Sequence, residues 1–352
     1  MDGVVSFRIG PRLIGGGAPC FVIAEAGVNH DGDPERARRL VEAAAAAGAD
    51  AVKFQTFDAG RLATTAAPKA AYQVATTGDG ESQLEMLRRL QLSNEAHRML
   101  AEAARAAGLI FLSTPFDPPS ADLLDSLDVP AFKLSSGELT NLPFLAYVAA
   151  KRRPLLVSTG MADLAEVEAA VDTIHETGAR DLALLHCVSS YPAAPEDANL
   201  RAMDTLAARF QVPVGFSDHT LGLEVALAAV ARGACVLEKH VTLDRTAPGP
   251  DHAASLEPAE FAALVRGVRR VEAALGHGRK EPAAAEADVA RVARRSLVAS
   301  RDIPEGAALT AGAVTALRPG TGLSPALLPS LLGRRARHAI AAGTLITLDM
   351  LS

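Results

Sequence analysis

Apolar and polar positions alternate in a repeating order from residue 21 to about residue 276. Each repeat has a short β-rich apolar run, then polar residues, then an Ala- and Leu-rich segment of helical period. The eight runs predicted to be strands cover residues 21–26, 51–56, 109–114, 131–136, 154–159, 182–187, 214–218 and 235–241. Strands that alternate with helices in this way predict a parallel sheet covered by helices.

The helical segments between the strands have recognisable ends. Asp33 and Pro34 fit an N-cap followed by proline in the first turn, and the helix that they begin should end at Gly48. A second helix is expected to run from an N-cap at Asp163 to a C-terminal stop at Gly178. These signals place helices between strands rather than long loops.

Two architectures fit eight such units, a closed barrel and an open doubly wound sheet. Eight units within about 255 residues match the usual size of a (β/α)8 TIM barrel. An open dinucleotide-binding sheet would carry a GxGxxG turn after its first strand, and the sequence has none there. We therefore predict a closed (β/α)8 TIM barrel.

The last part of the chain has a different pattern. Residues 277–293 are polar and Ala-rich, which predicts a linker or an exposed helix. In residues 294–352, short β runs are broken by Pro and Gly, which predicts a separate small β-rich domain. Within it, "ASRDIPEGAALTAGAV" and "ARHAIAAGTLITLDML" share one order of apolar, small, Gly and Thr positions. We interpret them as two halves of a pseudo-symmetric fold that follows a barrel of residues 1–276.

Composition and charge exclude some classes of function. The 352 residues carry a net charge of −6 and no long basic run, so no nucleic-acid partner is expected. No stretch of about 18 apolar residues is free of charge, and the N-terminus has no apolar signal core, so we expect a cytoplasmic protein without a membrane span. Cys20, Cys187 and Cys235 lack CxxC spacing and are expected to be reduced, buried thiols.

Polar residues gather where the predicted strands end, which is where barrel enzymes carry their active sites. Taken singly, a serine there is usually a cap, and a lysine is usually a surface cation. Lys53 and Lys133, however, lie within apolar strands and should point into the same barrel mouth. A buried lysine must be paired with an anion or lose its proton. Two such lysines among several hydroxyls predict a site for a phosphate or a carboxylate.

Two histidines, His219 and His240, are expected at the same mouth on neighbouring strands. Adjacent strands lie about 4.8 Å apart, so both imidazoles can reach one metal ion at about 2.1 Å. With only two protein ligands, water and substrate oxygens would complete the coordination, and a Lewis-acid role fits. A pair of hydrogen-bonded histidines that stiffens the rim is the alternative, and spacing alone leaves both open.

These residues belong to motifs that resemble the sialic acid (N-acetylneuraminate) synthase family. The motifs follow one another in family order: "VIAEAGVNHDGD", "AVKFQTF", "STPFD", "FKLSSGELTN", "LLVSTGMA", "LLHCVSSYP", "GFSDHTLG", "EKHVTLD" and "PGPDHAASLEP". The tail, with "SRDIPEG" and "LRPGTG", resembles the C-terminal antifreeze-like (SAF) domain of that family. The resemblance spans nearly the whole chain and agrees with a TIM barrel followed by a small β-rich domain.

The resemblance implies a reaction. Phosphoenolpyruvate condenses with an N-acylated amino sugar, N-acetylmannosamine, in its open-chain aldehyde form. The products are phosphate, released by C–O cleavage, and a nine-carbon 2-keto-3-deoxy acid. A divalent metal held by the residues that match His219 and His240 polarises the aldehyde; Mn²⁺ is expected, with Mg²⁺ or Co²⁺ as alternatives.

Further residues are assigned by matching the family motifs. The phosphoenolpyruvate contacts fall on Lys53, Thr114, Lys133, Ser136, Ser158, Ser189 and Ser217. The sugar contacts fall on Gln55, Tyr191 and Asp251, together with Arg318 of the SAF domain, which in the family covers the partner's barrel in a domain-swapped homodimer. Glu25 and Glu138 are both candidates to orient or deprotonate the water. At Ser189 the family members compared have Asn, so that contact is the one departure.

Three alternatives remain at this point. Relatives that make legionaminic or pseudaminic acid use 2,4-diacetamido-6-deoxy hexoses with the same barrel chemistry. A pyruvate aldolase would instead form a Schiff base on Lys133 or Lys239. A non-catalytic binding module carried by the C-terminal domain is the third, and the intact barrel site argues against it.

Overall fold

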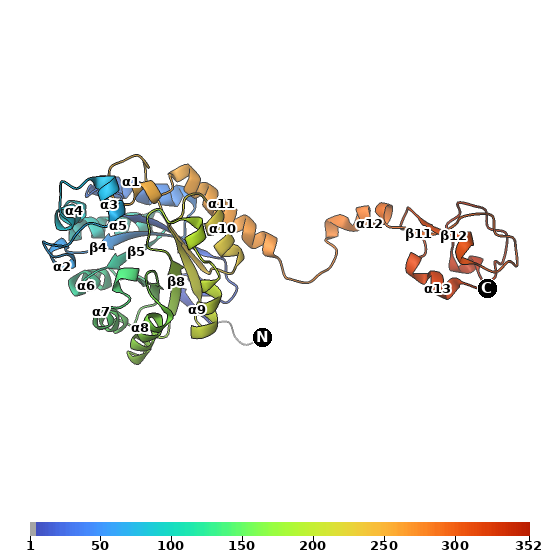
Figure 1. Cartoon of the computed structure of the whole chain (residues 1–352), viewed down its shortest axis with the longest axis horizontal. Coiled ribbons are helices and arrows are strands. Elements are labelled where there is room, and N and C mark those ends of the chain that lie inside the picture. Colours follow the sequence, from blue (N-terminus) through green and yellow to red (C-terminus); the bar gives the residue numbers. More distant parts are fainter. Residues whose placement is uncertain (1–4) are drawn as a thin grey trace. The chain divides into compact units, whose positions relative to one another are not determined.

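The computed structural model describes residues 5–352, and the chain forms two compact units, residues 1–276 and residues 277–352 (Figure 1). Eight parallel strands form the centre of the first unit: β3 (Phe21–Gly27), β4 (Ala51–Thr56), β5 (Ile110–Pro115), β6 (Phe132–Leu134), β7 (Leu155–Ser158), β8 (Leu182–Cys187), β9 (Val214–Asp218) and β10 (Val236–His240). They are paired in the order β5-β4-β3-β10-β9-β8-β7-β6, and β5 and β6 also pack against each other. The predicted barrel is therefore confirmed.

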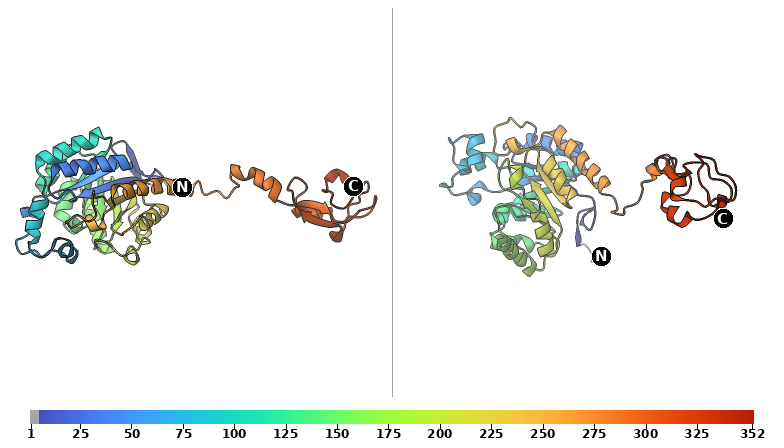
Figure 2. Two further views of the ribbon diagram at one scale, coloured as in Figure 1. Left: turned by 90° about the horizontal axis from the view of Figure 1, so that it is seen from above. Right: turned by 45° about the vertical axis from the view of Figure 1, so that its right-hand side comes forward.

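Helices surround the strands (Figure 2). The main ones are α1 (Pro34–Ala47), α5 (Asn94–Ala106), α6 (Pro118–Ser126), α7 (Leu142–Ala149), α8 (Leu164–Glu176), α9 (Ala202–Phe210), α10 (Glu224–Ala231) and α11 (Pro258–Leu275). The predicted end signals operate as expected. The Asp33 side chain accepts a hydrogen bond from the Glu35 N–H, and Gly48 ends α1 with a left-handed φ of 81°. Asp163 and Glu166 form a capping box at the start of α8.

An N-terminal hairpin that the pattern did not predict closes the amino end of the barrel. It consists of β1 (Ser6–Ile9) and β2 (Arg12–Gly15), paired antiparallel. Its residues Phe7, Ile9 and Ile14 are buried against the inward-facing apolar residues of the strands, such as Phe21 and Leu112. Because this end is filled with apolar side chains, the polar inward residues are confined to the carboxyl ends of the strands.

A long excursion joins β4 to α5. We call residues 57–93 the β4–α5 arm; it contains α2 (Ala59–Leu62), α3 (Ala71–Thr77) and α4 (Gln83–Leu90). The helix α4 is packed through Leu84, Met86 and Leu90, whereas α3 has no fully buried residue. Within the arm, α4 is therefore packed against buried apolar residues, whereas α3 is less buried.

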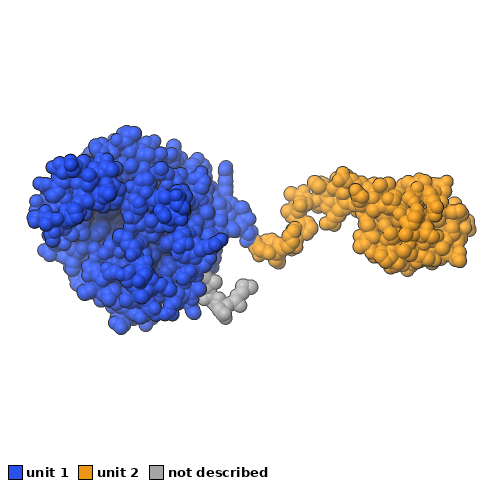
Figure 3. All heavy atoms as spheres, in the orientation of Figure 1, with its two compact units in different colours: residues 1–276 blue, residues 277–352 orange. Residues whose placement is uncertain are grey.

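The second unit, residues 277–352, is coloured orange in Figure 3. It has its own small core, which includes Leu297, Ile303, Ile340 and Ile346. The helix α12 (Ala287–Ala293) lies in the segment predicted to be a linker or an exposed helix, and none of its residues is buried. The strands β11 (Ser296–Ala299) and β12 (Val314–Leu317) pair antiparallel, and α13 (Leu328–Leu331) follows.

The internal echo predicted for this unit is confirmed. Ile303 and Ile340 exchange backbone hydrogen bonds of 2.8 and 2.9 Å. Each is followed by a turn with a left-handed glycine, Gly306 and Gly343, and then by a short 3-10 helix, Ala311–Ala313 or Leu348–Met350. The two segments thus have the same local structure and pair with each other.

Candidate active site

The carboxyl ends of the barrel strands enclose a cavity of about 450 Å³. It brings together most of the site residues predicted from the sequence: Glu25, Lys53, Gln55, Thr114, Lys133, Ser136, Ser158, Ser189, Tyr191, Ser217, His219 and His240. Strand geometry explains this convergence, because alternate residues of a strand face the barrel interior. Lys53 and Gln55 therefore share the inner face of β4, while Phe54 packs outward in the core.

The two lysines are buried and paired within this cavity. The Lys53 Nζ lies 2.8 Å from the Glu25 Oε2 and donates a 2.9 Å hydrogen bond to the Thr114 Oγ1. The Lys133 Nζ donates a 2.7 Å hydrogen bond to the Ser158 Oγ. Both ammonium groups are thus held in place by short contacts and aimed at one space.

Glu238 lies between the two lysines, and the sequence analysis gave it no role. Its Oε1 is 3.6 Å from the Lys133 Nζ and accepts a 2.9 Å hydrogen bond from the Ser217 Oγ, while its Oε2 is 3.7 Å from the Lys53 Nζ. Its position two residues before His240 on one strand placed it at the mouth, but only the structure shows that it faces both lysines. It is the counter-ion that allows two buried cations to share the cavity.

The two carboxylates of this cluster have opposite pKa shifts. Burial raises the pKa of Glu25 to about 7, because Lys53 offsets only part of the desolvation. Burial alone would also raise the pKa of Glu238, but the charges of Lys133 and Lys53 outweigh it and hold this pKa well below its usual range. Glu238 is therefore a permanent anion near neutral pH, whereas Glu25 can exchange a proton.

The pKa values of the two lysines are also shifted in opposite directions. Burial opposes the charged form of both. At Lys53, the carboxylates of Glu238 and Glu25 outweigh this effect and raise the pKa above its usual value. At Lys133, burial outweighs the attraction of Glu238 and lowers the pKa, and the positive charge of Lys53 lowers it further.

His219 and His240 lie side by side at the ends of β9 and β10, with ring centroids 5.5 Å apart. The His219 Nδ1 is 2.7 Å from the Val188 carbonyl oxygen, so this nitrogen carries the proton and the Nε2 lone pair is free. Burial lowers the pKa of His219 to about 4 and lowers that of His240 well below its usual value. Both imidazoles are therefore neutral, which is the form that binds a metal ion.

These residues fit a divalent metal held by few protein ligands. The His240 Nδ1 is buried without a hydrogen-bond partner, and the nearest carboxylate oxygen of Asp251 is 4.0 Å away. Among residues 5–352, no group of three or more His, Cys, Asp or Glu side chains is placed to hold an ion. A metal at this point would take two imidazoles from the chain and its other ligands from water or substrate.

The wall next to the histidines is aromatic. The ring centroids of Tyr191 and His219 are 4.2 Å apart. The Tyr191 ring also meets the His240 ring edge-on, with a centroid distance of 5.7 Å. Tyr72, on α3 of the β4–α5 arm, stacks on Tyr191 with ring centroids 5.0 Å apart. Tyr72 was not predicted from the sequence, because it lies on the short helix α3, which has no buried face, and no strand pattern near it places it at the barrel mouth.

The serines form a compact polar corner around Gly160. The Gly160 N–H donates a 2.9 Å hydrogen bond to the Ser136 Oγ, which is 3.1 Å from the Cys187 Sγ. A Cβ at position 160 would lie 2.5 Å from the Ser189 Oγ, so only glycine fits here. This corner holds Ser189, the one departure from the family pattern, and also the thiol of Cys187.

Three predicted site residues do not line the cavity. Glu138 is buried beside it, and its Oε2 accepts a 2.8 Å hydrogen bond from Asn141. Asp251 is buried behind His240, with burial raising its pKa to about 6. Arg318 is exposed in the second unit, where its Nε donates to the Ala293 carbonyl.

Two further residues face away from the mouth. His186, on β8, lies on the outer face of its strand and hydrogen-bonds the Ala198 carbonyl at 2.9 Å. Lys239, one of the two lysines considered for a Schiff base, is fully buried on the outer face of β10 and pairs with Asp218 at 2.6 Å. Of those two lysines, only Lys133 lines the cavity.

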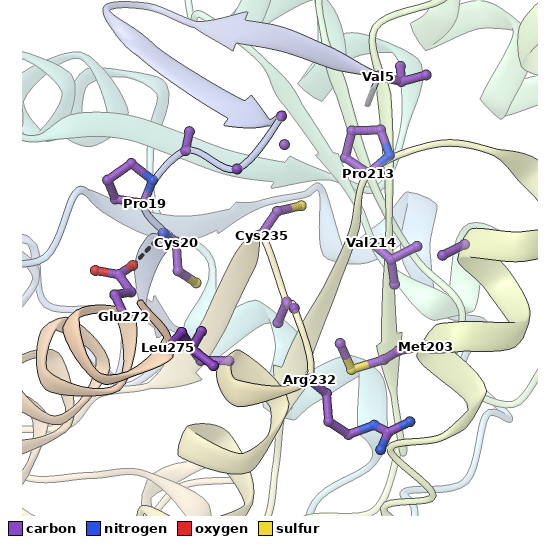
Figure 4. A pocket seen from close by; sticks show the side chains of 18 of the residues that line it. Val5, Pro19, Cys20, Met203, Pro213, Val214, Arg232, Cys235, Glu272 and Leu275 are labelled. Carbon is purple, nitrogen blue, oxygen red and sulfur yellow. Dashed lines mark hydrogen bonds between the residues drawn. The ribbon is translucent and has the colours of Figure 1, made fainter. Parts of the chain in front are cut away.

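A second cavity, of about 710 Å³, lies at the amino end of the strands, between the β1–β2 hairpin and the helices α9 to α11 (Figure 4). Its charged residues are already paired. Glu272 accepts a 2.6 Å hydrogen bond from the Cys20 N–H, and Arg232 pairs with Asp204. Cys20 and Cys235 are free thiols, and burial raises the pKa of both. This cavity has none of the converging polar groups of the barrel mouth.

Comparison with known proteins decides the family. A model described as the NeuB family matches residues 40–280, and one described as the SAF domain matches residues 294–352. The chain belongs to the NeuB family.

None of the helices in residues 5–352 combines the length and apolar character needed to cross a bilayer.

Individual NeuB relatives are similar over nearly their full length. The chain is 48% identical over 340 residues to N,N′-diacetyllegionaminic acid synthase of Legionella pneumophila, covering 96% of this chain and 95% of the relative. It is 46% identical over 316 residues to the synthase of the same name from Campylobacter jejuni, covering 89% of this chain and 95% of the relative.

A solved NeuB-type structure supports the same fold. The crystal structure of N-acetylneuraminic acid (sialic acid) synthetase from Leptospira borgpetersenii matches with a TM-score of 0.71 and 36% identity, over 81% of this chain and 95% of that one. The chain is thus an enzyme of the sialic acid synthase type. The relatives favour the legionaminic alternative over N-acetylneuraminate, which the sequence analysis had placed first.

Proposed function

We propose that this NeuB chain is an N,N′-diacetyllegionaminic acid synthase, which condenses phosphoenolpyruvate with the open-chain aldehyde of a 2,4-diacetamido-6-deoxy hexose. The observation that carries the proposal is the pair of buried lysines beside two neutral histidines in one cavity. The identity of the sugar draws support from the two legionaminic relatives. N-acetylmannosamine, which would give N-acetylneuraminate, is the alternative acceptor.

The chain binds phosphoenolpyruvate through Lys53 and Lys133, which face its phosphate and carboxylate. Hydroxyl donors surround the lysines and are suited to the remaining anionic oxygens: Thr114, Ser136, Ser158, Ser189 and Ser217. Glu238 holds both ammonium groups in position before the substrate arrives. Such preorganisation lowers the cost of ordering two long side chains on binding.

His219 and His240 are the residues that would hold a divalent cation, Mn²⁺ or alternatively Mg²⁺ or Co²⁺. When bound, the cation would act as a Lewis acid on the carbonyl oxygen of the sugar aldehyde. The Val188 carbonyl fixes the tautomer of His219 and thereby orients its free nitrogen. Gln55 and Tyr191 line this end of the cavity, and Asp251 is buried 4.0 Å from the His240 Nδ1; all three are proposed to position the sugar.

The proposed bond changes balance as follows. C3 of phosphoenolpyruvate forms a bond to the aldehyde carbon, and the aldehyde oxygen takes up a proton. Water adds to C2 and gives up one proton, which leaves a hydroxyl on C2. That hydroxyl loses its proton as the C2 carbonyl forms, while the bond between C2 and the bridging oxygen breaks and phosphate leaves with the electron pair and takes up a proton. The product is a nine-carbon 2-keto-3-deoxy acid with two acetamido groups.

Glu25 is the carboxylate we propose to handle the water. It lines the cavity, whereas Glu138 does not, and its raised pKa of about 7 suits proton exchange at neutral pH. Glu238 is less suited, because the lysines hold it in the ionised form. The choice that the sequence left open between Glu25 and Glu138 thus falls on Glu25.

We further propose a domain-swapped homodimer in which Arg318 of one subunit's SAF domain reaches the sugar's acyl group in the partner's barrel. The support is the match of residues 294–352 to the SAF domain and the resemblance of "LRPGTG" to the family motif.

A phosphate-release assay tests the function. The chain is incubated with phosphoenolpyruvate, Mn²⁺ and either a 2,4-diacetamido-6-deoxy hexose or N-acetylmannosamine, with a chelator control. The proposal predicts phosphate release with the diacetamido sugar at a higher kcat/KM than with N-acetylmannosamine. A preference for N-acetylmannosamine would instead assign the N-acetylneuraminate reaction, and no release with either sugar would reject both.

A further inference from the structure

The cavity has two chemically different ends. One end holds Lys53 and Lys133 among hydroxyl groups, and the other is a column of rings in which Tyr72 stacks on Tyr191 and Tyr191 lies tilted against His219. The column begins at the histidine pair, and Tyr72 is connected to His219 through the ring of Tyr191. Of these rings, only that of Tyr72 comes from outside the barrel strands and their short loops.

The attachment of Tyr72 differs from that of the other cavity residues. It lies at the start of α3, the helix of the β4–α5 arm that has no fully buried residue. Lys69, just before α3, binds back to the arm itself through the Thr77 Oγ1 at 3.0 Å and the Gly78 carbonyl. The arm is therefore internally braced, and Tyr72 is the aromatic side chain through which α3 contacts the barrel wall.

Gln73 adds an oriented amide next to this ring. Its Oε1 accepts a 2.9 Å hydrogen bond from the Ala70 N–H, and its Nε2 lies 3.4 Å from the Tyr72 hydroxyl. Ala70, Tyr72 and Gln73 all line the cavity. The arm thus presents one aromatic face and one fixed amide to whatever occupies the cavity beyond the histidines.

We propose that Tyr72, with Gln73 beside it, is a specificity-determining residue that recognises the apolar, acylated end of the sugar. The inference rests on the proposed function, in which the aldehyde carbon lies at the histidines. The far end of the sugar then extends along the ring column. A 2,4-diacetamido-6-deoxy hexose differs from N-acetylmannosamine at this end, carrying an acetamido group in place of the C4 hydroxyl and a methyl in place of the C6 hydroxymethyl group.

The chemistry of the column suits those groups. Aromatic rings bury methyl and planar amide surfaces favourably, and the polar edge of tyrosine retains a hydrogen-bonding group. A hydroxyl-rich sugar end gains less from the same surface, because its hydroxyls must give up water. Stacking on Tyr191 also fixes the Tyr72 ring before the sugar binds.

The test compares sugar preference in Tyr72→Ala and Tyr72→Phe. In Tyr72→Ala we expect kcat/KM for the diacetamido sugar to fall roughly 10- to 100-fold, mainly through KM, with a smaller loss for N-acetylmannosamine and an unchanged KM for phosphoenolpyruvate. Tyr72→Phe should keep most of the preference, because it keeps the ring. Val74→Ala, an exposed change on the same helix, and Tyr147→Ala, a tyrosine on the outer helix α7, are the matched controls and should behave as wild type.

The outcomes separate this inference from the function on which it rests. A wild-type enzyme that prefers the diacetamido sugar while Tyr72→Ala keeps the same preference ratio overturns the inference and leaves the function standing. Equal losses for both sugars together with a raised KM for phosphoenolpyruvate also overturn it, because they indicate general damage to the site. Tyr72→Phe as impaired as Tyr72→Ala contradicts recognition by the ring, and a wild-type enzyme that uses neither sugar overturns the function as well.

Discussion

At the scale of single residues, the site depends on what surrounds each ionisable group rather than on its type. Glu25 and Glu238 are both fully buried carboxylates near lysines, yet the pKa of Glu25 is raised and that of Glu238 is lowered. The difference arises because Glu238 faces both cations and Ser217, whereas Glu25 contacts Lys53 alone among the lysines. Neighbouring carboxylates whose pKa values are shifted in opposite directions are typical of acid–base sites.

The anion and metal ends of the cavity should be separable by mutation. We expect His219→Ala and His240→Ala to abolish turnover while phosphoenolpyruvate binding largely survives. Lys53→Ala and Lys133→Ala should weaken that binding about 100-fold, because each removes a charged partner of the anion. Isothermal titration of the four variants with phosphoenolpyruvate checks this. Undiminished binding in the lysine variants would contradict the anion site.

Removing the exchangeable proton of Glu25 should affect chemistry more than binding. In Glu25→Gln, which keeps the size of the side chain, we expect kcat to fall about 10²- to 10⁴-fold with the fold intact. Steady-state phosphate release measures the loss. Glu35→Gln, an exposed change on α1, serves as the control and should leave kcat unchanged. A Glu25→Gln enzyme within a few-fold of wild type would rule out the assigned role.

At the scale of elements, the strands were predictable and the irregular parts were not. Runs such as 51–56 combine β-rich composition with turn signals, and the boundaries of all eight strands agree with the structure to within two residues. The alternation on β4 also placed Lys53 correctly on the inner face. The β1–β2 hairpin and the β4–α5 arm were missed, because their short elements acquire their conformation from packing against the barrel.

The pattern shows which face of a strand a side chain occupies, but it does not show which distant segments meet at the site. Lys239 and Lys133 both follow apolar runs, but alternation turns Lys239 outward to Asp218. Tyr72 could not be assigned to the site, since it reaches Tyr191 only through the path of the arm. Periodicity can be detected within a short stretch of sequence, but contacts between distant segments cannot.

The hairpin that closes the amino end of the barrel depends on one half-buried carboxylate. Asp50 accepts hydrogen bonds from the Val22 N–H at 2.8 Å, from Arg269 at 2.8 Å and from Arg12 of β2. We expect Asp50→Ala to lower the free energy of unfolding by about 2 kcal/mol, since it leaves a buried donor without a partner. Urea unfolding followed by circular dichroism measures this.

Two comparisons make that result specific. Glu42→Ala removes an exposed partner of Arg38 and should change stability by less than about 0.5 kcal/mol. The folded Asp50→Ala enzyme should keep its kcat, because Asp50 lies at the opposite end of the strands from the cavity. Equal stability of the two variants would contradict the bracing role of Asp50.

At the scale of the whole molecule, the chain joins a barrel with a complete polar cavity to a small pseudo-symmetric SAF unit. The sequence predicted both, because the repeated strand–helix units and the internal echo are each periodic signals. The proposed contact of Arg318 with a partner subunit rests on the family resemblance, and an experiment on the assembled protein tests it.

Complementation between two inactive variants provides that experiment. Lys53→Ala disables the barrel, and Arg318→Ala disables the proposed contact from the SAF domain. In a domain-swapped homodimer, co-expression should restore turnover, because a mixed dimer contains one site with both residues intact. Activity of the co-expressed pair no higher than that of the two variants alone would argue against the swap.

The proposed reaction joins phosphoenolpyruvate to the diacetamido sugar aldehyde with C–O cleavage. Phosphoenolpyruvate labelled with ¹⁸O at the bridging oxygen tests this reaction, with both products analysed by mass spectrometry. We expect the label to appear in the phosphate and an unlabelled nine-carbon diacetamido keto acid to form. Label retained in the keto acid, or no condensation product with this sugar, would contradict it.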